Sequence, residues 1–326
     1  MEIRRDFYLD KLIKSTGYDE ISLSSLSTSD YSKLSELTDV LIEEYASKNI
    51  GISLPSLRLD NFTMEIAEKI QQVRKSGLTF APEAGTQRLR DVINKGVSEE
   101  DLQNATKKAF EMGWNSVKLY FMIGLPTETY DDLDGIAKLA YDVIDMYREV
   151  HNGKLKRSFG VTVSTSTFVP KPFTPFQWHP QDTQDVVRDK QQYLVKALKN
   201  RDIRYNYHDS KTSLMEAVIS RGDRRIGKVI YDAFKAGAKF DGWSEYFNLD
   251  TWKEAMEKNN LSIDFYANRE RSYDEVFPWD HIDVGVSKKF LIRENEKAKS
   301  DTVTPDCRHK CNACGINAHD IGRGMC

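Results

Sequence analysis

Short apolar runs alternate with amphipathic helical patterns through roughly the first half of the chain. Apolar residues recur every three or four positions in segments that we expect to be helices, at 3–16, 34–42, 63–75, 87–93, 98–113 and 133–147. The runs between them have the length of buried strands, at 21–23, 52–54, 78–81, 117–123 and 159–165. This order predicts right-handed β-α-β units, and therefore an α/β fold with about five parallel strands in a partial barrel.

A helix with no strand before it opens this pattern. Leu9, Leu12 and Ile13 have helical spacing, and Gly17 follows them as a good C-terminal stop. A parallel barrel of this kind normally begins with a strand. We therefore expect the first strand to be supplied elsewhere, or to be missing because the chain is an N-terminally truncated fragment.

The pattern changes after residue 170. Prolines with interleaved aromatic residues predict an extended crossing over 170–180, and helical patterns return at 182–200, 213–234 and 249–258. A strand end is expected at 204–208, and residues 259–300 look irregular. We therefore divide the chain into a partial barrel core at 1–180, a mainly helical or irregular extension at 181–300 and a cysteine-rich tail at 301–326.

Composition excludes several classes of protein. The formal net charge is −3, and the 30% of charged residues are mixed in sign along the chain, so there is no clear nucleic-acid signature. No apolar run reaches the length of about 18 residues that a membrane span needs, and the amphipathic first residues do not resemble a signal peptide. We expect a cytoplasmic protein without membrane association.

All the cysteines lie in the last twenty residues, as Cys307, Cys311, Cys314 and Cys326. A disulfide framework would be spread over the fold, so this clustering predicts a metal site in a reducing compartment. The spacing C-x3-C-x2-C lets three thiolates hold one face of an iron–sulfur cubane, leaving one iron for Cys326 or for a chelating ligand.

Zinc is the main alternative at this tail. Zinc also accepts four cysteines or three cysteines and a histidine, and His309 and His319 are nearby. Structural zinc sites usually contain two C-x2-C pairs, whereas this tail has one, which favours iron–sulfur. A tail without metal is the remaining alternative.

Small polar residues follow the expected strands, where reactive groups gather in parallel α/β barrels. Ser24 and Ser25 follow the first strand, Glu83 the third, and Gly124 the fourth. Such residues suit an organic ligand, since Glu83 can accept hydrogen bonds and Gly124 permits close approach of the backbone to a flat ring. The alternatives are helix caps for the serines, a solvated loop for Glu83 and a tight turn at Gly124.

Three further features have structural alternatives. The basic segment 221–225 could hold an anionic group, although salt bridges at a helix junction explain it equally well. His208 could be a base, but a hydrogen-bonded structural role is commoner. Four of the five tryptophans are expected in the core or between domains rather than in a base-stacking platform; they are Trp178, Trp243, Trp252 and Trp279.

Several segments together resemble a known family. YDEISLSSLSTSDY, GISLPSLRLDNF, GLTFAPEAGTQRLRDVINKG, VKLYFMIGLPTET and FVPKPFTPFQW are similar to the later motifs of the radical S-adenosylmethionine (SAM) core. They most resemble an uncharacterised subgroup with a cobalamin-binding-like domain ahead of that core. The resemblance extends to the RGDRR segment and to DCRHKCNACG in the tail.

The resemblance implies a [4Fe-4S] cluster whose open iron binds SAM. It also implies reductive cleavage to a 5′-deoxyadenosyl radical, and an electron donor such as flavodoxin or ferredoxin. By position, Ser24 and Ser25 would face the methionyl amine, Glu83 the ribose, and Ile123 and Gly124 the adenine. Cobalamin would enter only through an N-terminal domain that this chain lacks, and no substrate or catalytic residue is implied.

The chain departs from the family at the cluster motif. That motif normally follows the first strand, whereas the C-x3-C-x2-C here lies at the opposite end of the sequence. Either the chain is truncated and the tail holds an auxiliary cluster, or the tail folds back over the barrel and supplies the SAM cluster. A non-catalytic module with a zinc-stabilised tail is the alternative function. A metal-free hydrolase or aldolase is disfavoured because no G-x-S-x-G elbow and no apolar strand-end lysine occur.

Overall fold

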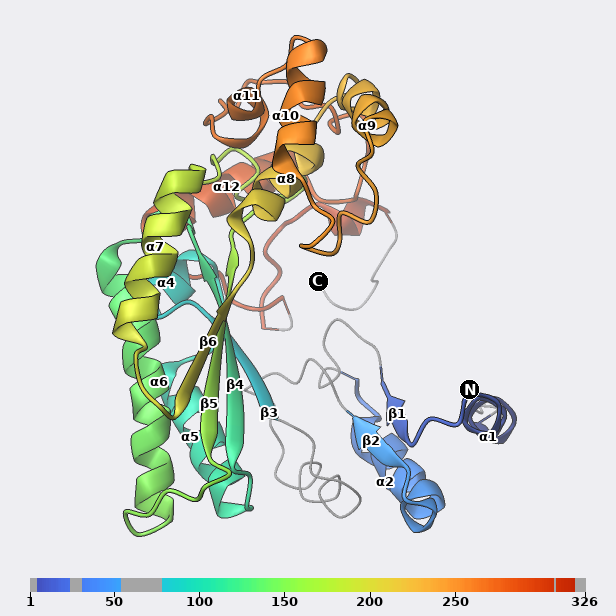
Figure 1. The fold of residues 1–326 in the computed structure, drawn as a ribbon, viewed down its shortest axis with the longest axis vertical. Coiled ribbons are helices and arrows are strands. Elements are labelled where there is room, and N and C mark those ends of the chain that lie inside the picture. Colours follow the sequence, from blue (N-terminus) through green and yellow to red (C-terminus); the bar gives the residue numbers. More distant parts are fainter. Residues whose placement is uncertain (1–4, 24–30, 54–77, 308, 320–326) are drawn as a thin grey trace.

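The computed structural model describes residues 5–23, 31–53, 78–307 and 309–319 (Figure 1). The expected helix at 63–75 therefore lies outside the described residues, as do Ser24, Ser25 and Cys326.

A small α/β unit forms the N-terminal part of the described chain. It contains α1 (Arg5–Thr16), β1 (Glu20–Ser22), α2 (Leu34–Tyr45), η2 (Ala46–Lys48) and β2 (Gly51–Ser53). β1 and β2 pair in parallel with Ile21 opposite Ile52, and both side chains are buried together with Leu41 and Tyr45. The expected first helix and first two strands are confirmed.

The main sheet has four parallel strands in the order of the sequence. They are β3 (Leu78–Glu83), β4 (Ser116–Ile123), β5 (Gly160–Thr167) and β6 (Ile203–Tyr207). The connections contain α4 (Gln87–Val92), α5 (Glu99–Glu111), α6 (Tyr130–Val150) and α7 (Gln184–Ala197). In Figure 1, α5, α6 and α7 lie together along one face of this sheet.

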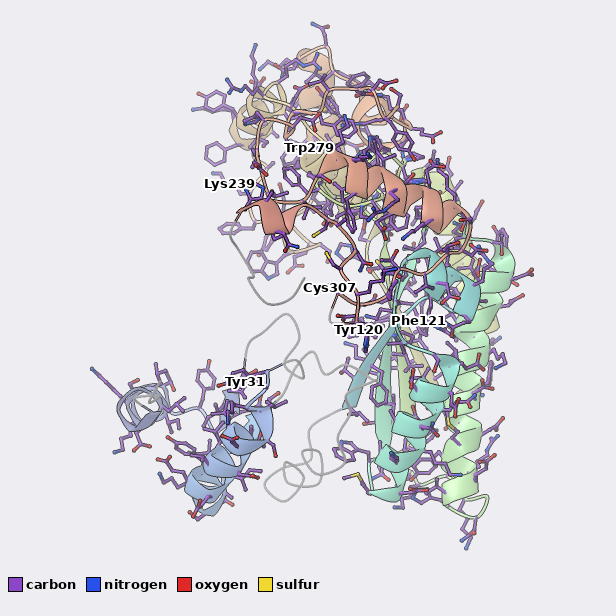
Figure 2. All side chains as sticks on the ribbon, turned by 180° about the vertical axis from the view of Figure 1, so that it is seen from behind. Tyr31, Tyr120, Phe121, Lys239, Trp279 and Cys307 are labelled. Atoms are coloured by element: carbon purple, nitrogen blue, oxygen red, sulfur yellow. The ribbon has the colours of Figure 1, made fainter. Side chains whose placement is uncertain are left out.

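Among the described residues, helices cover one face of the main sheet, and the alternation along β4, where Figure 2 labels Tyr120 and Phe121, explains why. Leu119 and Phe121 are 0% and 1% exposed and belong to the same core as residues of α5 and α6. On the other face Tyr120 is 40% exposed, and the Lys118 ammonium lies 4.4 Å from the centre of its ring. Successive strand residues point to opposite faces, so the polar set of β4 is left on the face away from the helices.

The expected set of five strands in one barrel needs correction. Over the described residues, β1 and β2 pair only with each other, while the strand end expected at 204–208 is β6, a full member of the main sheet. β6 was hard to recognise because it is an edge strand in which only Ile203 is buried. Pairing between strands distant in the sequence is not encoded in the apolar pattern of either strand.

The C-terminal extension is a helical layer at the end of the sheet where β6 leads into α8 (Figure 1). It contains α8 (Ser210–Ser220), α9 (Ile226–Lys235), α10 (Leu249–Lys258) and α11 (Ile263–Ala267), which share a separate core. Residues expected to be irregular contain the helix α12 (Lys288–Lys299), which was missed because its buried stripe is narrow and most of its residues are charged. A short helix, η3 (Ile316–His319), follows in the tail.

Candidate functional site

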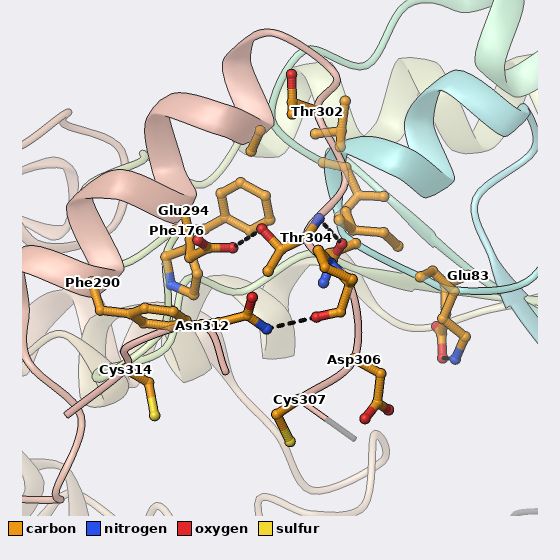
Figure 3. A pocket seen from close by; sticks show the side chains of 18 of the residues that line it. Glu83, Phe176, Phe290, Glu294, Thr302, Thr304, Asp306, Cys307, Asn312 and Cys314 are labelled. Carbon is orange, nitrogen blue, oxygen red and sulfur yellow. Dashed lines mark hydrogen bonds and ion pairs between the residues drawn. The ribbon is translucent and has the colours of Figure 1, made fainter. Parts of the chain in front are cut away.

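A cavity of about 700 Å³ lies between the carboxyl ends of β3, β4 and β5 and the C-terminal tail (Figure 3). Its wall is largely apolar, with Met122, Leu125, Phe168 and Phe176 from the sheet side and Phe290 from α12. Polar groups occupy one part of the lining, which includes Glu83, Lys95, Glu294, Thr304, Asp306, Cys307, Asn312 and Cys314. An apolar cavity with a few converging polar groups is the common form of a small-molecule site.

Hydrogen bonds hold the tail against the strand ends. The backbone N–H of Thr304 donates to the side-chain oxygen of Asn94 at 2.9 Å, and the Thr304 hydroxyl donates to Glu294 of α12 at 2.5 Å. Asp301 lies 3.6 Å from the Arg88 guanidinium of α4. Contacts between residues some 200 positions apart therefore bring the cysteines to this edge of the sheet.

The turn after Cys314, the last cysteine of the C-x3-C-x2-C motif, is also held in place by contacts with α12. The backbone N–H of Ser287 donates to the carbonyl of Cys314 at 2.8 Å, next to the first turn of α12. Gly315 has a φ of 112°, and a Cβ there would lie 3.1 Å from the carbonyl oxygen of Gly285. Glycine is needed at this close approach, which ties the cysteine segment to α12.

Two of the predicted cluster ligands line the cavity. Cys307 is exposed, Cys314 is half-buried, and Figure 3 places Cys307 between Glu83 and Cys314 in the view. The Cys311 sulfur accepts a hydrogen bond from the Asn317 amide at 3.8 Å.

The thiols fit an iron–sulfur cluster in donor type and spacing. In the described part of the chain, no three His, Cys, Asp or Glu side chains are gathered closely enough to hold a metal ion. Binding would therefore require the cysteine segment to draw its sulfurs together.

Glu83 is the predicted ligand-binding residue that the structure brings to the cavity. It ends β3 with a φ of 69°, next to an irregularity in the pairing of β3 with β4. Its carboxylate lies 3.3 Å from the Lys95 ammonium, which also lines the cavity. The backbone conformation is rare for a residue with a Cβ and is commoner at functional sites.

Ile123 and Gly124 lie at the end of β4 but do not line this cavity. Ile123 is fully buried in the core between sheet and helices. Gly124 has a φ of 79°, and its N–H donates to the Glu128 carboxylate at 2.8 Å. The adenine contact that we predicted for these residues stays a prediction, and the observed role of the Gly124 N–H is to bind Glu128.

A buried ion cluster underlies this turn. The Lys190 ammonium lies 2.8 Å from Glu128 and 2.7 Å from Asp182. Burial raises the pKa of Glu128, and Lys190 opposes that effect. Burial alone would lower the pKa of Lys190, but the two carboxylates raise it. Each charge in the cluster has a partner of opposite sign, so the cluster stabilises the turn.

The other candidates have structural roles in the described residues. Arg221 donates to the carbonyls of Ala267 at 2.7 Å and Arg269 at 3.2 Å, which supports the helix-junction interpretation of 221–225. The His208 Nδ1 lies 2.9 Å from the Ser213 hydroxyl of α8.

The prediction for the tryptophans was right for three and wrong for one. Trp178, Trp252 and Trp279 are buried as expected, whereas Trp243 is 58% exposed. Trp243 lies between α9 and α10, where it contacts Phe240, which is itself exposed. Because an aromatic side chain in a loop has no periodic neighbours, the sequence pattern carried no signal of its exposure.

Sequence reasoning missed the contribution of α12 and of the polar face of β4. Phe290, Glu294 and Ala298 recur every four residues and line the cavity, and this spacing was the available signal. The alternation of Lys118, Tyr120 and Met122 with apolar residues could likewise have identified the polar face of β4.

Part of the chain matches a known protein family. Residues 8–140, from within α1 to within α6, match the model of the Radical SAM superfamily. Residues 8–140 carry a radical SAM superfamily domain. This radical SAM domain includes β3 and β4, whose ends line the cavity.

A curated relative is an uncharacterised protein, MJ0966, of Methanocaldococcus jannaschii. It is 31% identical over 218 residues, which are 67% of this chain and 45% of that protein. The chain therefore matches less than half the length of this relative. None of the helices within the described ranges is long and apolar enough to cross a membrane.

Proposed function

We propose that this chain is a radical SAM enzyme, or part of one, with an iron–sulfur cluster in its cysteine tail beside the cavity at the strand ends. One observation supports this most directly, because Cys307 and Cys314 line the same cavity as Glu83 at the end of β3. Since β3 belongs to the radical SAM domain, the thiols lie next to the strand ends where such barrels place their chemistry.

Cys307, Cys311 and Cys314 would hold the cluster, with Cys326 as the candidate fourth ligand. When bound, the cluster would supply the electron that cleaves SAM reductively. The Glu83 carboxylate would accept hydrogen bonds from the ribose or the amine of SAM, and Ser24 and Ser25 would face the amine. The apolar wall of Met122, Phe168 and Phe176 would exclude water from the reacting groups.

The anchoring of the tail favours its folding back over the sheet as the source of the SAM cluster. Thr304 and Asp301 hold the tail to α4 and its following loop through Asn94 and Arg88. The electron donor, such as flavodoxin or ferredoxin, and a cobalamin domain elsewhere remain expectations from the family. The cytoplasmic location remains an expectation from composition, and the substrate is unidentified.

The first experiment compares the anaerobically reconstituted chain with the variant Cys307→Ala/Cys311→Ala/Cys314→Ala. We expect iron, sulfide and the cluster absorption to be lost in the triple variant, and 5′-deoxyadenosine to form from SAM and dithionite only with the unmodified chain. Cys326→Ala is the companion variant that tests the fourth ligand. Iron lost in the variant without product from either protein would assign the tail to a second cluster, and zinc in place of iron would favour a zinc-stabilised module.

Glu83 provides a test that does not depend on turnover. Glu83→Gln keeps the size of the side chain but removes its charge, so we expect weaker binding of SAM at unchanged iron content. Loss of one charge-assisted hydrogen bond should weaken binding about tenfold. Glu100→Gln is the matched control, because Glu100 is an exposed carboxylate of α5 outside the cavity. Equal SAM affinity in Glu83→Gln and the unmodified chain would contradict the assignment.

A further inference from the structure

Aromatic side chains gather on the outer face of α9 and on the loop that joins it to α10. Five of them are between 52% and 67% exposed; they are Tyr231, Phe234, Phe240, Trp243 and Tyr246. None of these residues lines the cavity beside the cysteines, and Figure 1 shows α9 on the side of the helical layer away from α7. Single exposed aromatic residues are ordinary, but a contiguous patch of them marks an interaction surface.

Contacts within the loop hold these rings in place. Asp241 accepts a hydrogen bond from the indole Nε1 of Trp252 at 3.1 Å, and the Trp243 N–H donates to the carbonyl of Phe240 at 3.0 Å. Phe240 has a φ of 60°, which is rare for a bulky residue. Its ring meets those of Trp243 and Tyr246 at interplanar angles of 71° and 57°. The rings therefore do not stack on one another, and flat aromatic faces remain exposed.

Positive charge is concentrated on the same segment. Residues 224–240 contain one acidic residue, Asp232, and five basic residues, which are Arg224, Arg225, Lys228, Lys235 and Lys239. Asp232 is held by Lys258 and Asn259 at 2.8 Å each, and Arg225 pairs with Asp223. The other four basic side chains are exposed. In a chain with a net charge of −3, this local excess fits an anionic partner, and we call residues 224–246 the aromatic–basic surface.

The charges of this surface are interleaved with its rings. The Lys235 ammonium lies 5.5 Å from the centre of the Tyr231 ring, and the Lys239 ammonium lies 5.5 Å from the centre of the Phe234 ring; Figure 2 labels Lys239. A helix that lies on a membrane separates its cations from its apolar face, and the cores of protein interfaces are depleted of lysine. Single-stranded nucleic acid suits the mixed arrangement, because bases stack on rings while the phosphates between them contact cations.

We propose that the aromatic–basic surface binds single-stranded RNA. Bases stack on Trp243 and its neighbouring rings, and phosphates contact Lys235 and Lys239. Glu245, an exposed carboxylate close to Trp243 in the chain, repels a phosphate but can accept a hydrogen bond from a ribose 2′-hydroxyl. DNA lacks this hydroxyl, so Glu245 favours RNA. The site is separate from the cavity beside the cysteines and does not rest on the cluster or on SAM cleavage.

The test measures binding of fluorescein-labelled oligo(U) of about ten nucleotides to the full chain by fluorescence anisotropy. We expect saturable binding that weakens with salt, with a slope of about −0.7 per phosphate contact in a plot of log affinity against log salt concentration. RNA should also quench the tryptophan fluorescence. All five tryptophans are among the described residues, and the four others are at most 7% exposed, so this quenching reports on Trp243.

Substitutions separate the stacking contribution from the charge contribution. Trp243→Ala should weaken binding about tenfold at an unchanged salt slope, because it removes only a stacking surface. Lys239→Gln should weaken binding less but make the salt slope shallower by about 0.7. The matched controls are Tyr18→Ala, at a 72% exposed aromatic residue before β1, and Lys107→Gln, at an exposed lysine of α5. Both should bind RNA as the unmodified chain does.

Oligo(dU) of the same length tests the choice of RNA. It should bind more weakly than oligo(U), and Glu245→Gln should narrow the difference. Equal affinity for the two oligomers would overturn the assignment to RNA. Absence of saturable oligo(U) binding, or equal weakening by Trp243→Ala and Tyr18→Ala, would overturn the site. Binding of phosphatidylserine vesicles without binding of RNA would assign the surface to a membrane instead, and a dimer lost in Trp243→Ala would assign it to a second copy of the chain.

Discussion

Two regions of this protein bury charge, and they do so in opposite ways. Under the turn after β4, the ammonium of Lys190 lies between the carboxylates of Glu128 and Asp182, and each charge has a partner within 2.8 Å. Beneath α12, Arg221 and Arg271 are just as deeply buried but donate to carbonyl oxygens, and the Arg271 guanidinium also lies over the rings of Phe277 and Trp279. In the first region every charge is paired, whereas in the second the Nε groups of Arg221 and Arg271 have no hydrogen-bond partner among the described residues.

This difference separates buried charges that pair with opposite charges from buried charges that are held by carbonyl oxygens and aromatic rings. A buried charge with good partners stabilises one local conformation, and a ligand would gain little there. A buried cation that lies against carbonyl oxygens and aromatic rings recovers less of its desolvation cost, so removing it should cost less stability. The same residue types therefore predict different responses to mutation, depending on what lies within hydrogen-bond reach.

The largest expected effect follows from breaking the complete cluster. Lys190→Met would leave the Glu128 carboxylate, whose side chain is 1% exposed, without its counter-ion. We expect the free energy of unfolding to fall by about 3–5 kcal/mol, measured by urea denaturation at neutral pH. Adding Glu128→Gln to Lys190→Met should recover part of that loss. A loss below about 1 kcal/mol for Lys190→Met would contradict the proposed role of the cluster.

Substitution of Gly124, which lies beside this cluster, is expected to have the next largest effect on the free energy of unfolding. Gly124→Ala places a Cβ 3.0 Å from the Asp182 carboxylate, which Lys190 holds in place. The alanine would also have to adopt the positive φ of 79° that the glycine has there. We expect a loss of about 2 kcal/mol in the free energy of unfolding. Gly153→Ala is the matched control, since Gly153 has the same φ of 79° with open space around it. Equal losses at the two positions would show that the Asp182 contact contributes nothing.

A smaller effect is expected from the incomplete region. Arg221→Met removes hydrogen bonds to the carbonyls of Ala267 and Arg269 but also removes an uncompensated buried charge. These changes oppose each other, so we expect the free energy of unfolding to fall by only about 1 kcal/mol. The measurement is the same urea titration. A loss as large as that of Lys190→Met would remove the distinction between the two regions.

The ion pair between Asp223 and Arg225 is expected to have the smallest effect on the free energy of unfolding, and this effect depends on pH. Hydrogen bonding to Arg225 lowers the pKa of Asp223 to about 2 in the folded protein. Since this folded value lies below the unfolded value of about 3.9, the pair stabilises the fold above pH 4 and loses that contribution as the pH falls toward 2. Because Arg225 is 60% exposed, solvent screens the pair and its contribution is small. Asp223→Asn should make the unfolding free energy flatter between pH 4 and 2, and an unchanged acid slope would contradict it.

Local signals predicted much of the fold. The S-x-x-D motif at Ser98 and Asp101 indicated a capping box, and the structure confirms it with hydrogen bonds of 3.0 and 2.8 Å at the start of α5. The long amphipathic pattern of 133–147 is the central part of α6. These elements were predictable because a helix face and a cap depend on residues three or four positions apart.

The site was predictable only in part. Glu83 was singled out because it follows an apolar strand, and it does line the cavity, together with Cys307 and Cys314 from the other end of the chain. Ile123 and Gly124 were chosen by the same reasoning, but the Gly124 N–H is used by Glu128. The end of a strand shows at which edge of the sheet a residue lies. Which side chains bind its backbone depends on how the following segments pack.

What the sequence determined by itself is therefore the order and type of the elements, the polar strand ends and the presence of a cysteine segment with metal-ligand spacing. What only the tertiary structure decided is which of these groups share a cavity. Thr304 meets Asn94, and Arg271 meets Arg221, across long stretches of chain. Such contacts depend on how whole elements pack, and no periodicity within a single segment records them.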